Sequence, residues 1–453
     1  MPGKHGGTGQ AIIARGQGEF RDMAEVCPFR GIRYNQEIIG DLDKVICPPY
    51  DVIAPEQQEI YYEMSDYNAI RLEYGIEQSG DNNIDNKYSR AAETFQRWLK
   101  EGVLQVEEQP AFYLHDHYFA HLGEKKRRRG LIARVKLGQW GKGIYPHEET
   151  FSKAKSDRLQ LMRACQANFS PLLALYQDPD GEVVKVLSDT SRDKPVMELA
   201  SSDERHTVWA VTEPKSVQRI SELLVVKPLH MADGHHRYET ALAYQQERAQ
   251  KLASATGKEA FNYVMMSLVD FSDPGLVILS ISRLVKGIAP SVLAELENRL
   301  GKLFTLEYIP LDKDLTDRFK RGVSAGAFLG VLGLKHNFVV VLRQRQDDAS
   351  ADMLPGSHSL AYRNPDVGLV TDTVLSKILA LAPDSGNIAY TANIDEACQQ
   401  VEQGAYQLAF LLSHPGSEMV KAVADARDRM PAKSTYFYPK LPAGLIINSL
   451  DQL

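Results

Sequence analysis

The sequence has few cysteines, no long apolar run and no excess of positive charge, and each absence narrows the possible functions. Its four cysteines, Cys27, Cys47, Cys165 and Cys398, lie far apart, which argues against a disulfide framework or a cysteine-ligated zinc site. No run of about eighteen apolar residues occurs, so no helix is expected to span a membrane. Lys and Arg number 52 against 59 Asp and Glu. The net charge of -7 argues against a chain that covers nucleic acid or an anionic membrane with its whole surface.

The remaining composition is typical of a globular intracellular protein. Of the 453 residues, 43% are hydrophobic and 25% are charged, and this length suffices for two or three domains without disulfides. Scattered cysteines indicate reduced thiols, so we predict a cytoplasmic location. Residues 1–26 are rich in glycine and lack the apolar core of a secretory signal, so we expect a flexible extension there.

Strand-like and helix-like segments alternate along the chain after residue 26. Predicted strands at 225–231, 263–271 and 407–412 are interleaved with predicted helices after 234 and within 367–381. This order predicts an α+β or mixed α/β fold rather than a helical bundle or a β-sandwich. We expect an α+β region with a hairpin at 27–200 and an α/β region at 201–453.

A predicted hairpin carries the most basic stretch of the sequence. Strands at 111–120 and 131–137 flank residues 123–130, which places the five consecutive basic residues Lys125–Arg129 at the tip. We expect a solvated tip, because blocks of like charge usually remain in water; a phosphate-binding arm is the alternative. His115 and His117 would share one face of the first strand, but with no third ligand evident we expect no zinc site there.

The run Leu229-His-Met-Ala-Asp-Gly-His-His-Arg-Tyr238 is the most informative in the chain. A predicted strand precedes Asp233, and apolar residues at helical spacing begin at Tyr238, which places Asp233–Arg237 at a strand-to-helix turn. The start of a helix presents backbone N–H groups and a positive dipole end, which favour an anion. Gly234 permits close approach of the backbone to a ligand, Arg237 would bind phosphate through two hydrogen bonds, and either histidine would transfer a proton.

Two other interpretations of this turn remain open. In the first, Asp233 simply caps the helix, and the two histidines are exposed in its first turn. In the second, His230, Asp233 and one of the paired histidines bind a metal ion. Adjacent helical residues point about 100° apart, so His235 and His236 would not readily bind one ion together.

Three further segments carry polar groups suited to phosphate chemistry. The run His147-Glu-Glu-Thr150 precedes a predicted helix with Arg158, and a capped polar helix start is the alternative. The segment from Met430 to Lys440 suits a loop that places a lysine beside phosphate, or a C-terminal strap packed on the core. Asp51 follows two prolines that restrict the backbone, so it would orient an amine or a metal, or begin the next turn.

These segments resemble two known groups of proteins. The Asp233–Arg237 turn is similar to the GHHR-type motif of the ParB/sulfiredoxin-like superfamily, whose phosphotransferase members include free-serine kinases that bind nucleotide or phosphate at the equivalent turn. Nearly everything after Val26 resembles a widespread prokaryotic family carried as a domain of unknown function (domain 1015). The segments that carry this second resemblance are Pro28-Phe-Arg-Gly31, Pro48-Pro-Tyr-Asp-Val-Ile53, Asn68-Ala-Ile-Arg-Leu-Glu73, His147-Glu-Glu-Thr150, Asp157-Arg-Leu159, Ala232-Asp-Gly-His-His-Arg-Tyr238 and Met430-Pro-Ala-Lys-Ser-Thr-Tyr-Phe-Tyr-Pro-Lys440.

The resemblance implies a cytoplasmic protein with a ParB/sulfiredoxin-like core elaborated by additional strands and helices, and a ligand related to serine or phosphoserine. The chain departs from the family where a Pro-x-His-Arg turn is expected, because it has Ser280-Ile-Ser-Arg283. Arg283 is retained while Ser282 replaces the histidine, which puts the substrate or activity of this member in question.

These observations lead to the hypothesis of a phosphotransferase that acts on a free hydroxy amino acid, with L-serine as the expected substrate. The donor would be ATP, ADP or pyrophosphate with Mg²⁺, bound at Gly234–Arg237, since no Walker-type loop is present. The alternatives are a phosphoserine-type phosphatase, a non-catalytic sensor of nucleotide or phosphoserine, and a ParB-like nucleic-acid-binding protein. Neither a membrane nor nucleic acid is expected as a partner, and the oligomeric state is not predicted.

The site residues of this hypothesis fall into three groups. The predicted catalytic residues are His236, His235, Asp233 and Glu148; phosphate or nucleotide binding is assigned to Gly234, Arg237, Arg283, Lys433, Ser434 and Lys440, and substrate binding to Asp51, Arg71, His147, Thr150 and Arg158.

Overall fold

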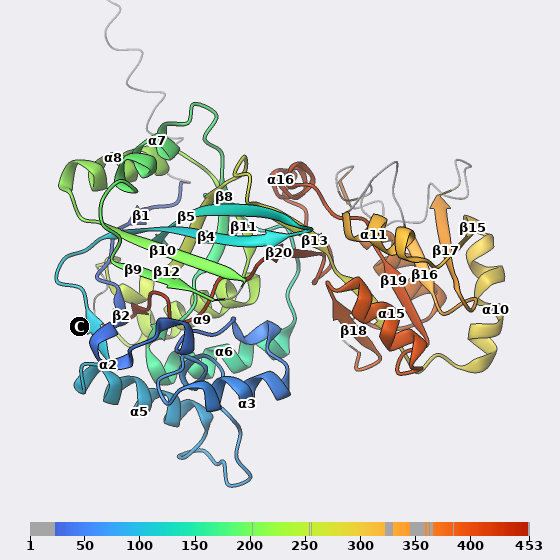
Figure 1. Cartoon of the computed structure of the whole chain (residues 1–453), viewed down its shortest axis with the longest axis horizontal. Coiled ribbons are helices and arrows are strands. Elements are labelled where there is room, and N and C mark those ends of the chain that lie inside the picture. The colour runs from blue at the N-terminus through green and yellow to red at the C-terminus, as the bar shows by residue number, and fades with distance from the viewer. Residues whose placement is uncertain are drawn as a thin grey trace, which may run out of the picture. The chain divides into compact units, whose positions relative to one another are not determined.

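The chain forms two compact units, each with its own sheet and hydrophobic core (Figure 1). The computed structural model describes residues 23–201, 203–252, 254, 256–321, 329–344, 358–359, 362, 366–383 and 385–451. Unit 1 contains the described residues up to Tyr145, those in Lys153–Gly275, and those from Lys440 onward. Unit 2 contains those in Pro146–Ser152 and Leu276–Pro439.

Unit 1 is built on a nine-stranded mixed sheet. Strands β6 and β11 pair in parallel, as do β8 and β12, and the other pairs are antiparallel, with β1 (Val26–Cys27) beside β5. The remaining strands are, in spatial order, β6 (Ile144–Tyr145), β11 (Leu229–Asp233), β8 (Leu172–Tyr176), β12 (Tyr263–Asp270), β5 (Glu124–Lys136), β4 (Phe112–His121), β10 (Glu204–Val211) and β9 (Met197–Ala200).

Both faces of this sheet are covered. Successive residues of a strand point to opposite faces, and along β4 Phe112 and Leu114 enter one hydrophobic cluster while Tyr113 enters another with Phe95 and Trp98. Figure 1 shows α7 and α8 on one side of the sheet, with α5 and α6 on the other. Burial on both sides explains why central strands such as β12 are almost entirely apolar.

The helices of unit 1 begin at recognisable signals. Asn86 accepts hydrogen bonds from the first-turn N–H groups of α5, whose buried residues Ala91, Phe95 and Trp98 have helical spacing. The helices and 3₁₀ turns are α2 (Gln36–Ile39), η2 (Leu42–Lys44), η3 (Tyr50–Val52), α3 (Pro55–Met64), α4 (Ile70–Glu73), α5 (Lys87–Lys100), α6 (Ser152–Cys165), α7 (Glu182–Thr190), α8 (Pro214–Leu224), α9 (His235–Gln250) and η4 (Ala260–Asn262). Two small strand pairs complete the unit, β2 (Ile32–Tyr34) with β3 (Leu104–Val106) and β7 (Ala167–Asn168) with β21 (Asn448–Ser449).

Unit 2 is built on a six-stranded antiparallel sheet. Its strands are, in spatial order, β15 (Phe304–Pro310), β17 (Phe338–Gln344), β16 (Leu329–Leu332), β19 (Leu408–Leu411), β14 (Ser282–Val285) and β18 (Ile388–Thr391). Strands β13 (Val277–Ser280) and β20 (Thr435–Tyr438) form a separate antiparallel pair. The helices are α10 (Pro290–Gly301), α11 (Lys313–Arg321), α14 (Asp366–Gly368), the π-helix η5 (Leu369–Ile378), α15 (Ile394–Glu402) and α16 (Ser417–Asp425).

The predicted mixed α/β class is confirmed. The strand ending at Asp233, the helix after Gly234 and the strand from Tyr263 all occur close to their predicted positions. Ala200 ends β9 and Glu204 begins β10 of the same sheet, whereas the chain passes from one unit to the other after Tyr145, Ser152, Gly275 and Pro439. Most of the extension predicted at 1–26 lies outside the described residues, and Val26 belongs to β1.

The prediction of a basic hairpin tip at Lys125–Arg129 is wrong. The turn between the two strands is Leu122–Gly123, and all five basic residues belong to strand β5. Arg128 and Arg129 are buried. The guanidinium of Arg129 donates two hydrogen bonds of 2.7 Å to the carboxylate of Asp116. The strand extends through this basic run because a buried carboxylate compensates a buried cation, which the local sequence does not reveal.

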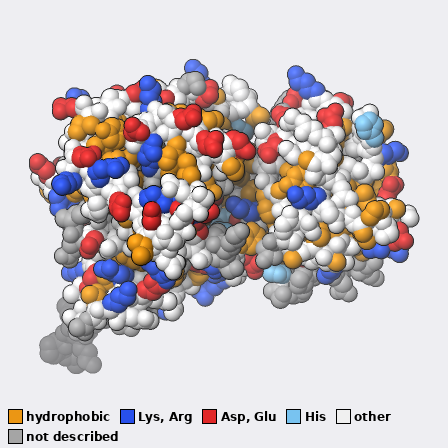
Figure 2. Space-filling view, turned by 90° about the horizontal axis from the view of Figure 1, so that it is seen from below, with side chains coloured by type: hydrophobic (Ala, Val, Ile, Leu, Met, Phe, Trp, Pro, Cys, Tyr) orange, Lys and Arg blue, Asp and Glu red, His pale blue; other side chains and the backbone are white. Residues whose placement is uncertain are grey.

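Among the described residues, no helix combines the length and the apolar character that a membrane span requires. On the face seen in Figure 2, Lys and Arg side chains are interspersed with Asp and Glu.

The Asp116–Arg129 pair leads to a stability prediction. Asp116→Asn leaves the buried Arg129 guanidinium without its counter-charge, and removal of one partner of a buried ion pair typically costs about 3–5 kcal/mol. Lys125→Gln, at an exposed position of the same strand, should change stability by less than about 0.5 kcal/mol. Urea unfolding followed by circular dichroism measures both, and equal effects would contradict the buried-pair assignment.

Candidate functional site

The predicted strand-to-helix turn is present in unit 1. Strand β11 ends at Asp233, Gly234 has a φ of +94°, and α9 begins at His235. A Cβ at Gly234 would lie 2.9 Å from Leu172 Cγ and 3.2 Å from a guanidinium nitrogen of Arg237. The positive φ and this close internal packing therefore both require glycine, and the packing role was not predicted.

Asp233 binds two cations at this turn. Its Oδ2 accepts a hydrogen bond of 2.9 Å from Arg237 Nη2, and its Oδ1 accepts one from Lys440 Nζ. Arg237 is buried, and its Nη1 also donates to Ser170 Oγ at 2.9 Å and to the Pro171 carbonyl at 3.1 Å. Arg237 thus supports the turn from within the protein, and Lys440 brings the C-terminal segment to the same carboxylate.

The polar contacts continue inward to a buried glutamate. Ser170 Oγ donates to Glu73 Oε1 at 3.1 Å, and Arg158 Nη1 donates to the Glu73 carbonyl at 2.7 Å. The Arg158 guanidinium lies over the Tyr50 ring, 4.0 Å from its centroid. Burial raises the pKa of Glu73, although the charges of Arg158 and Arg237 oppose that shift.

A second carboxylate, that of Asp157, lies beside Arg158 and extends these polar contacts. It accepts hydrogen bonds from Arg158 Nε at 2.8 Å and from Tyr88 OH at 2.8 Å, and forms an ion pair with Lys87 Nζ at 2.9 Å. Burial raises the pKa of Asp157, but these three partners outweigh it and lower the pKa to about 2. We call this series the charge chain; in order, it consists of Lys87, Asp157, Arg158, Glu73, Ser170, Arg237, Asp233 and Lys440.

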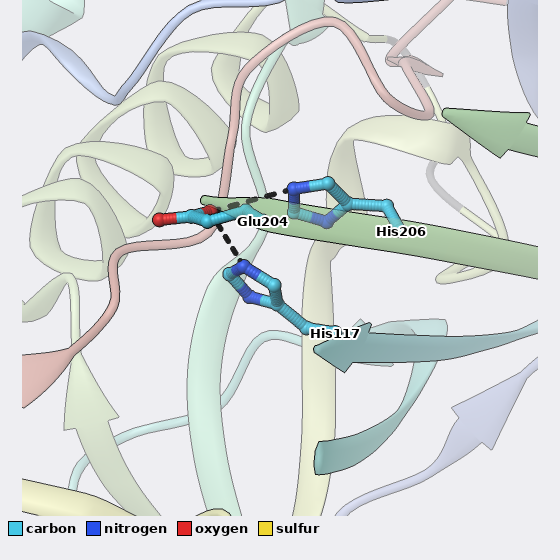
Figure 3. Close-up of side chains that lie close together, drawn as sticks. All are labelled: His117, Glu204 and His206. Atoms are coloured by element: carbon cyan, nitrogen blue, oxygen red, sulfur yellow. Dashed lines mark hydrogen bonds and ion pairs between the residues drawn. The ribbon is translucent and has the colours of Figure 1, made fainter. Parts of the chain in front are cut away.

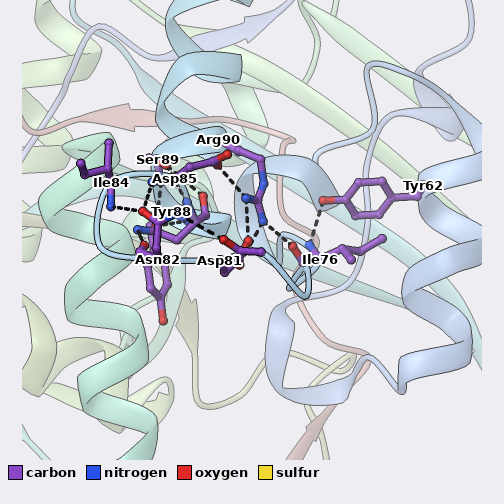
Figure 4. A network of polar contacts seen from close by, with 11 residues as sticks. Tyr62, Ile76, Asp81, Asn82, Ile84, Asp85, Tyr88, Ser89 and Arg90 are labelled. Carbon is purple, nitrogen blue, oxygen red and sulfur yellow. Dashed lines mark hydrogen bonds and ion pairs between the residues drawn. The ribbon is translucent and has the colours of Figure 1, made fainter.

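The outer end of the charge chain is fixed by the loop before α5 (Figure 4). Arg90 donates to Asp81 Oδ2 at 3.1 Å, to Asp85 Oδ1 at 2.8 Å and to the Ile76 carbonyl at 3.0 Å. These contacts hold the loop against the first turns of α5. They therefore position Lys87, the first residue of that helix.

A small cavity of about 40 Å³ adjoins the charge chain and is lined in part by Glu73, Arg158, Ser170 and Arg237. A cavity of about 10–15 Å³ admits one water molecule, so this volume accommodates very few waters and no nucleotide. A phosphate donor would therefore have to bind outside this cavity.

The two histidines of the turn differ in exposure. His235 is buried, with its ring centroid 6.2 Å from that of Trp140, whereas His236 is half-buried. Asp51, on η3, is exposed. Burial lowers the pKa of Arg237, but the charges of Asp233 and Asp51 outweigh it and raise the pKa.

In unit 2, the predicted residues His147 and Glu148 fasten the C-terminal segment. His147 Nε2 lies 2.9 Å from Thr435 Oγ1, and the His147 carbonyl accepts from the Met430 N–H at 2.7 Å. Glu148 Oε1 accepts from the Thr435 N–H at 2.7 Å, and Oε2 accepts from the Lys433 N–H at 3.2 Å. These contacts give Glu148 a structural role in addition to any chemical one.

Arg283, also in unit 2, is 1% exposed. Its Nη1 donates to the Ile281 carbonyl, while no described residue accepts a hydrogen bond from its Nε or Nη2. Burial lowers the pKa of Arg283 to about 10. Ser282, which stands where the family resemblance implies histidine, is buried beside it in β14.

The predicted site residues divide between the units. Arg71 is not a member of the charge chain; it donates to the Tyr62 carbonyl at 3.0 Å and to Asp66 at 3.2 Å, and lines a groove of about 570 Å³ that Lys87 also lines. Unit 1 holds Asp51, Arg71, Arg158, Asp233, Gly234, His235, His236, Arg237 and Lys440, and unit 2 holds His147, Glu148, Thr150, Arg283, Lys433 and Ser434.

Sequence reasoning missed Glu73, Asp157, Ser170 and Lys87. Glu73 and Asp157 do occur in segments that carry the family resemblance, close to the predicted site residues Arg71 and Arg158. That position in the sequence was the available signal for both carboxylates. Ser170 and Lys87 had no such signal. A metal site that uses His230 and Asp233 receives no support, because no close group of three metal-ligating side chains among the described residues includes either of them.

The chain matches one described protein family and is distantly similar to several solved structures. The family described as "Protein of unknown function (DUF1015)" matches residues 26–362. A conserved hypothetical protein from Pyrococcus furiosus is 16% identical over 66% of this chain and 90% of that chain, with a TM-score of 0.33. A free serine kinase variant in complex with ADP is 14% identical over 66% of this chain and 87% of that chain, with a TM-score of 0.34.

A C-terminally truncated SbnI from Staphylococcus aureus is 11% identical over 68% of this chain and 84% of that chain, with a TM-score of 0.31. No curated protein matches the chain. These structural likenesses are too distant to assign an activity.

The packing at Gly234 leads to a second stability prediction. Gly234→Ala combines backbone strain with overpacking against Leu172 and Arg237, and should destabilise unit 1 by about 1–3 kcal/mol more than Gly141→Ala. Gly141 has a similar φ of +81° with no atom within 4 Å of its Cβ position, so it isolates the strain alone. Equal urea midpoints for the two variants would contradict the close packing.

Proposed function

We propose a function for this chain, which belongs to the DUF1015 family of proteins of unknown function, as its sequence segments predicted. In this proposal, unit 1 is a phosphotransferase for a free hydroxy amino acid. L-Serine is the proposed acceptor. The transferable phosphate of the donor would bind at the start of α9, between the Gly234 turn and Lys440.

The observation that carries this proposal is the pairing of Asp233 with both Lys440 and Arg237 at a helix start. Gly234 supplies no side chain to cap α9, and the helix of 16 residues directs its positive dipole end toward this turn. A phosphate there would meet the helix start and the Lys440 ammonium in a charge-assisted contact. Because the lysine stem is flexible, Lys440 can exchange Asp233 for phosphate without backbone motion.

Arg237 would act as a positioning residue. Its guanidinium contacts Asp233, Ser170 and the Pro171 carbonyl rather than the outer face of the turn. It would hold the Asp233 carboxylate in place and connect the first turn of α9 to Ser170 and Pro171, which precede β8. This role differs from the direct phosphate contact that the sequence suggested.

His236 is the proposed proton acceptor. It is half-buried, whereas His235 is buried against Trp140, so His236 is the more accessible imidazole. In the proposed step the serine Oγ–H gives its proton to His236, Oγ forms a bond to phosphorus, and the phosphoanhydride bond of the donor breaks. A positioned general base typically contributes about 10²–10⁴-fold to the rate.

Asp51 is the residue best placed to hold Mg²⁺ or the ammonium of the substrate. Mg²⁺ prefers carboxylate oxygens, and both oxygens of Asp233 already accept hydrogen bonds from cations, whereas Asp51 is exposed and its charge acts on Arg237. Bound Mg²⁺ would neutralise charge on the donor phosphates.

Two alternatives use the same turn. If phosphoserine is the phosphoryl donor and water is the acceptor, the site hydrolyses phosphoserine and releases serine and inorganic phosphate. If no group is transferred, it senses nucleotide or phosphoserine by binding alone. Nucleic-acid binding loses the support of a basic tip, because Arg128 and Arg129 are buried in β5.

Phosphorus NMR of the purified full chain with L-serine and Mg²⁺, and with ATP, ADP or pyrophosphate in turn, tests the proposal. We expect phosphoserine with at least one donor, and a loss of about 10²–10⁴-fold in rate for His236→Ala because the general base is gone. His121→Ala, at the far end of β4, is the matched control and should retain the wild-type rate.

Other outcomes contradict the proposal in distinct ways. Inorganic phosphate released from phosphoserine, with no phosphoserine formed from any donor, assigns a phosphatase. Binding of a donor without turnover assigns a sensor. An equal loss of rate in His121→Ala and His236→Ala would remove His236 from the chemistry.

A further inference from the structure

Strands β4 and β10 bring three histidines and a glutamate together on one face of the unit 1 sheet (Figure 3). His115 and His117 alternate along β4, and His206 of β10 lies directly opposite His117 in the antiparallel register. Glu204 lies two residues before His206 and therefore on the same face. The ligand atoms of His117, Glu204 and His206 all lie within 4.8 Å of one another, the one such group among the described residues.

The imidazoles of His117 and His206 converge on one carboxylate oxygen of Glu204. Glu204 Oε2 lies 2.6 Å from His117 Nε2 and 3.5 Å from His206 Nε2 (Figure 3). His117 and His206 are buried, with 0% and 3% exposure, whereas the Glu204 side chain is 34% exposed. The group is thus closed on the imidazole side and open to solvent on the carboxylate side.

His115 fixes the orientation of His206. Its Nε2 lies 3.0 Å from His206 Nδ1. When His206 donates its Nδ1 proton to His115, its Nε2 lone pair points toward Glu204. Metal-binding histidines typically donate their second ring N–H to a partner in this way, which sets the tautomer of the ligand. His115 would therefore act as a positioning residue for His206.

We propose that His117, His206 and Glu204 form a binding site for a divalent first-row transition ion such as Zn²⁺. Zn²⁺ binds histidine nitrogen and carboxylate oxygen at about 2.0–2.2 Å, so tetrahedral ligands lie roughly 3.3 Å apart. The 3.5 Å spacing of Glu204 Oε2 and His206 Nε2 already fits this geometry. The 2.6 Å contact between Glu204 and His117 would open by less than about 1 Å as the ion replaces the shared hydrogen bond.

The ligand set also selects the class of ion. Two imidazoles and one carboxylate suit zinc or iron(II), whereas Mg²⁺ and Ca²⁺ prefer oxygen ligands alone. Three protein ligands leave a fourth position open, on the side where Glu204 meets solvent.

The neighbouring cation Arg128 would lower the affinity of this site for a metal ion. Arg128 Nη2 lies 3.3 Å from His117 Nδ1 and donates to it, so the metal-free His117 carries its proton on Nε2. Binding at Nε2 moves that proton to Nδ1 and displaces Arg128, which therefore opposes binding.

The test is titration of the chelator-stripped full chain with Zn²⁺ in competition with a chromophoric chelator. We expect one Zn²⁺ per chain, and a loss of at least tenfold in affinity for Glu204→Gln, which keeps the side-chain shape and removes the ligating charge. Glu198→Gln, at an exposed position of the adjacent strand β9, should leave the affinity unchanged. Circular dichroism of each metal-free variant verifies folding.

Two further measurements keep the proposal falsifiable should a variant unfold. X-ray absorption of the zinc-loaded wild type should show nitrogen and oxygen ligands, with imidazole scattering and without sulfur. Arg128→Gln should tighten Zn²⁺ binding, a gain that a merely structural role of Arg128 would not produce. No stoichiometric Zn²⁺ binding, sulfur in the coordination shell, or an equal loss in Glu198→Gln and Glu204→Gln would overturn the proposal and leave a closed hydrogen-bonded network.

Discussion

A buried charge must meet an opposite charge, and the architecture of unit 1 around α9 depends on this constraint. The charge chain alternates cations and carboxylates from Lys87 to Lys440, with Ser170 as the neutral link. An isolated charge in a low-dielectric interior costs several kcal/mol, so each member stabilises its neighbours only while the series is complete. The charge chain thereby ties together α4, α5, α6, the segment before β8, β11, α9 and Lys440, which are remote in sequence.

The same constraint shapes the other half of the sheet. Asp116 and Arg129 compensate each other on one face of the β4–β5 ladder, while Arg128 meets His117 on the opposite face. The run of five basic residues therefore belongs to a regular strand, in which Arg128 and Arg129 enter buried polar clusters on opposite faces. Both the proposed phosphate site and the proposed metal site follow from this use of buried charge: each consists of groups whose charges are already oriented and partly compensated within the protein.

The sequence predicted features set by local rules and failed where distant partners decide. The turn from Asp233 to Arg237 was predicted because an apolar strand, a glycine and a helical repeat adjoin one another. The hairpin tip was placed wrongly because Lys125–Arg129 shows no apolar alternation, and only Asp116 across the ladder makes a buried strand possible there. The partners of His117 were not foreseen because Glu204 and His206 lie on a strand almost ninety residues away. Glu73 and Ser170 were missed for the same reason, since 97 residues separate them.

The central claim is that Asp233 holds Lys440 where it can bind an anion at the start of α9. Isothermal titration calorimetry of pyrophosphate binding to the full chain at constant ionic strength tests it most directly. Lys440→Met should weaken binding about tenfold or more, as expected for loss of one charge-assisted contact. Lys227→Met removes an equivalent Lys–Asp pair, with Asp178, elsewhere in unit 1 and should leave binding unchanged. Equal affinity of the Lys440→Met variant and the wild type for pyrophosphate would contradict the account.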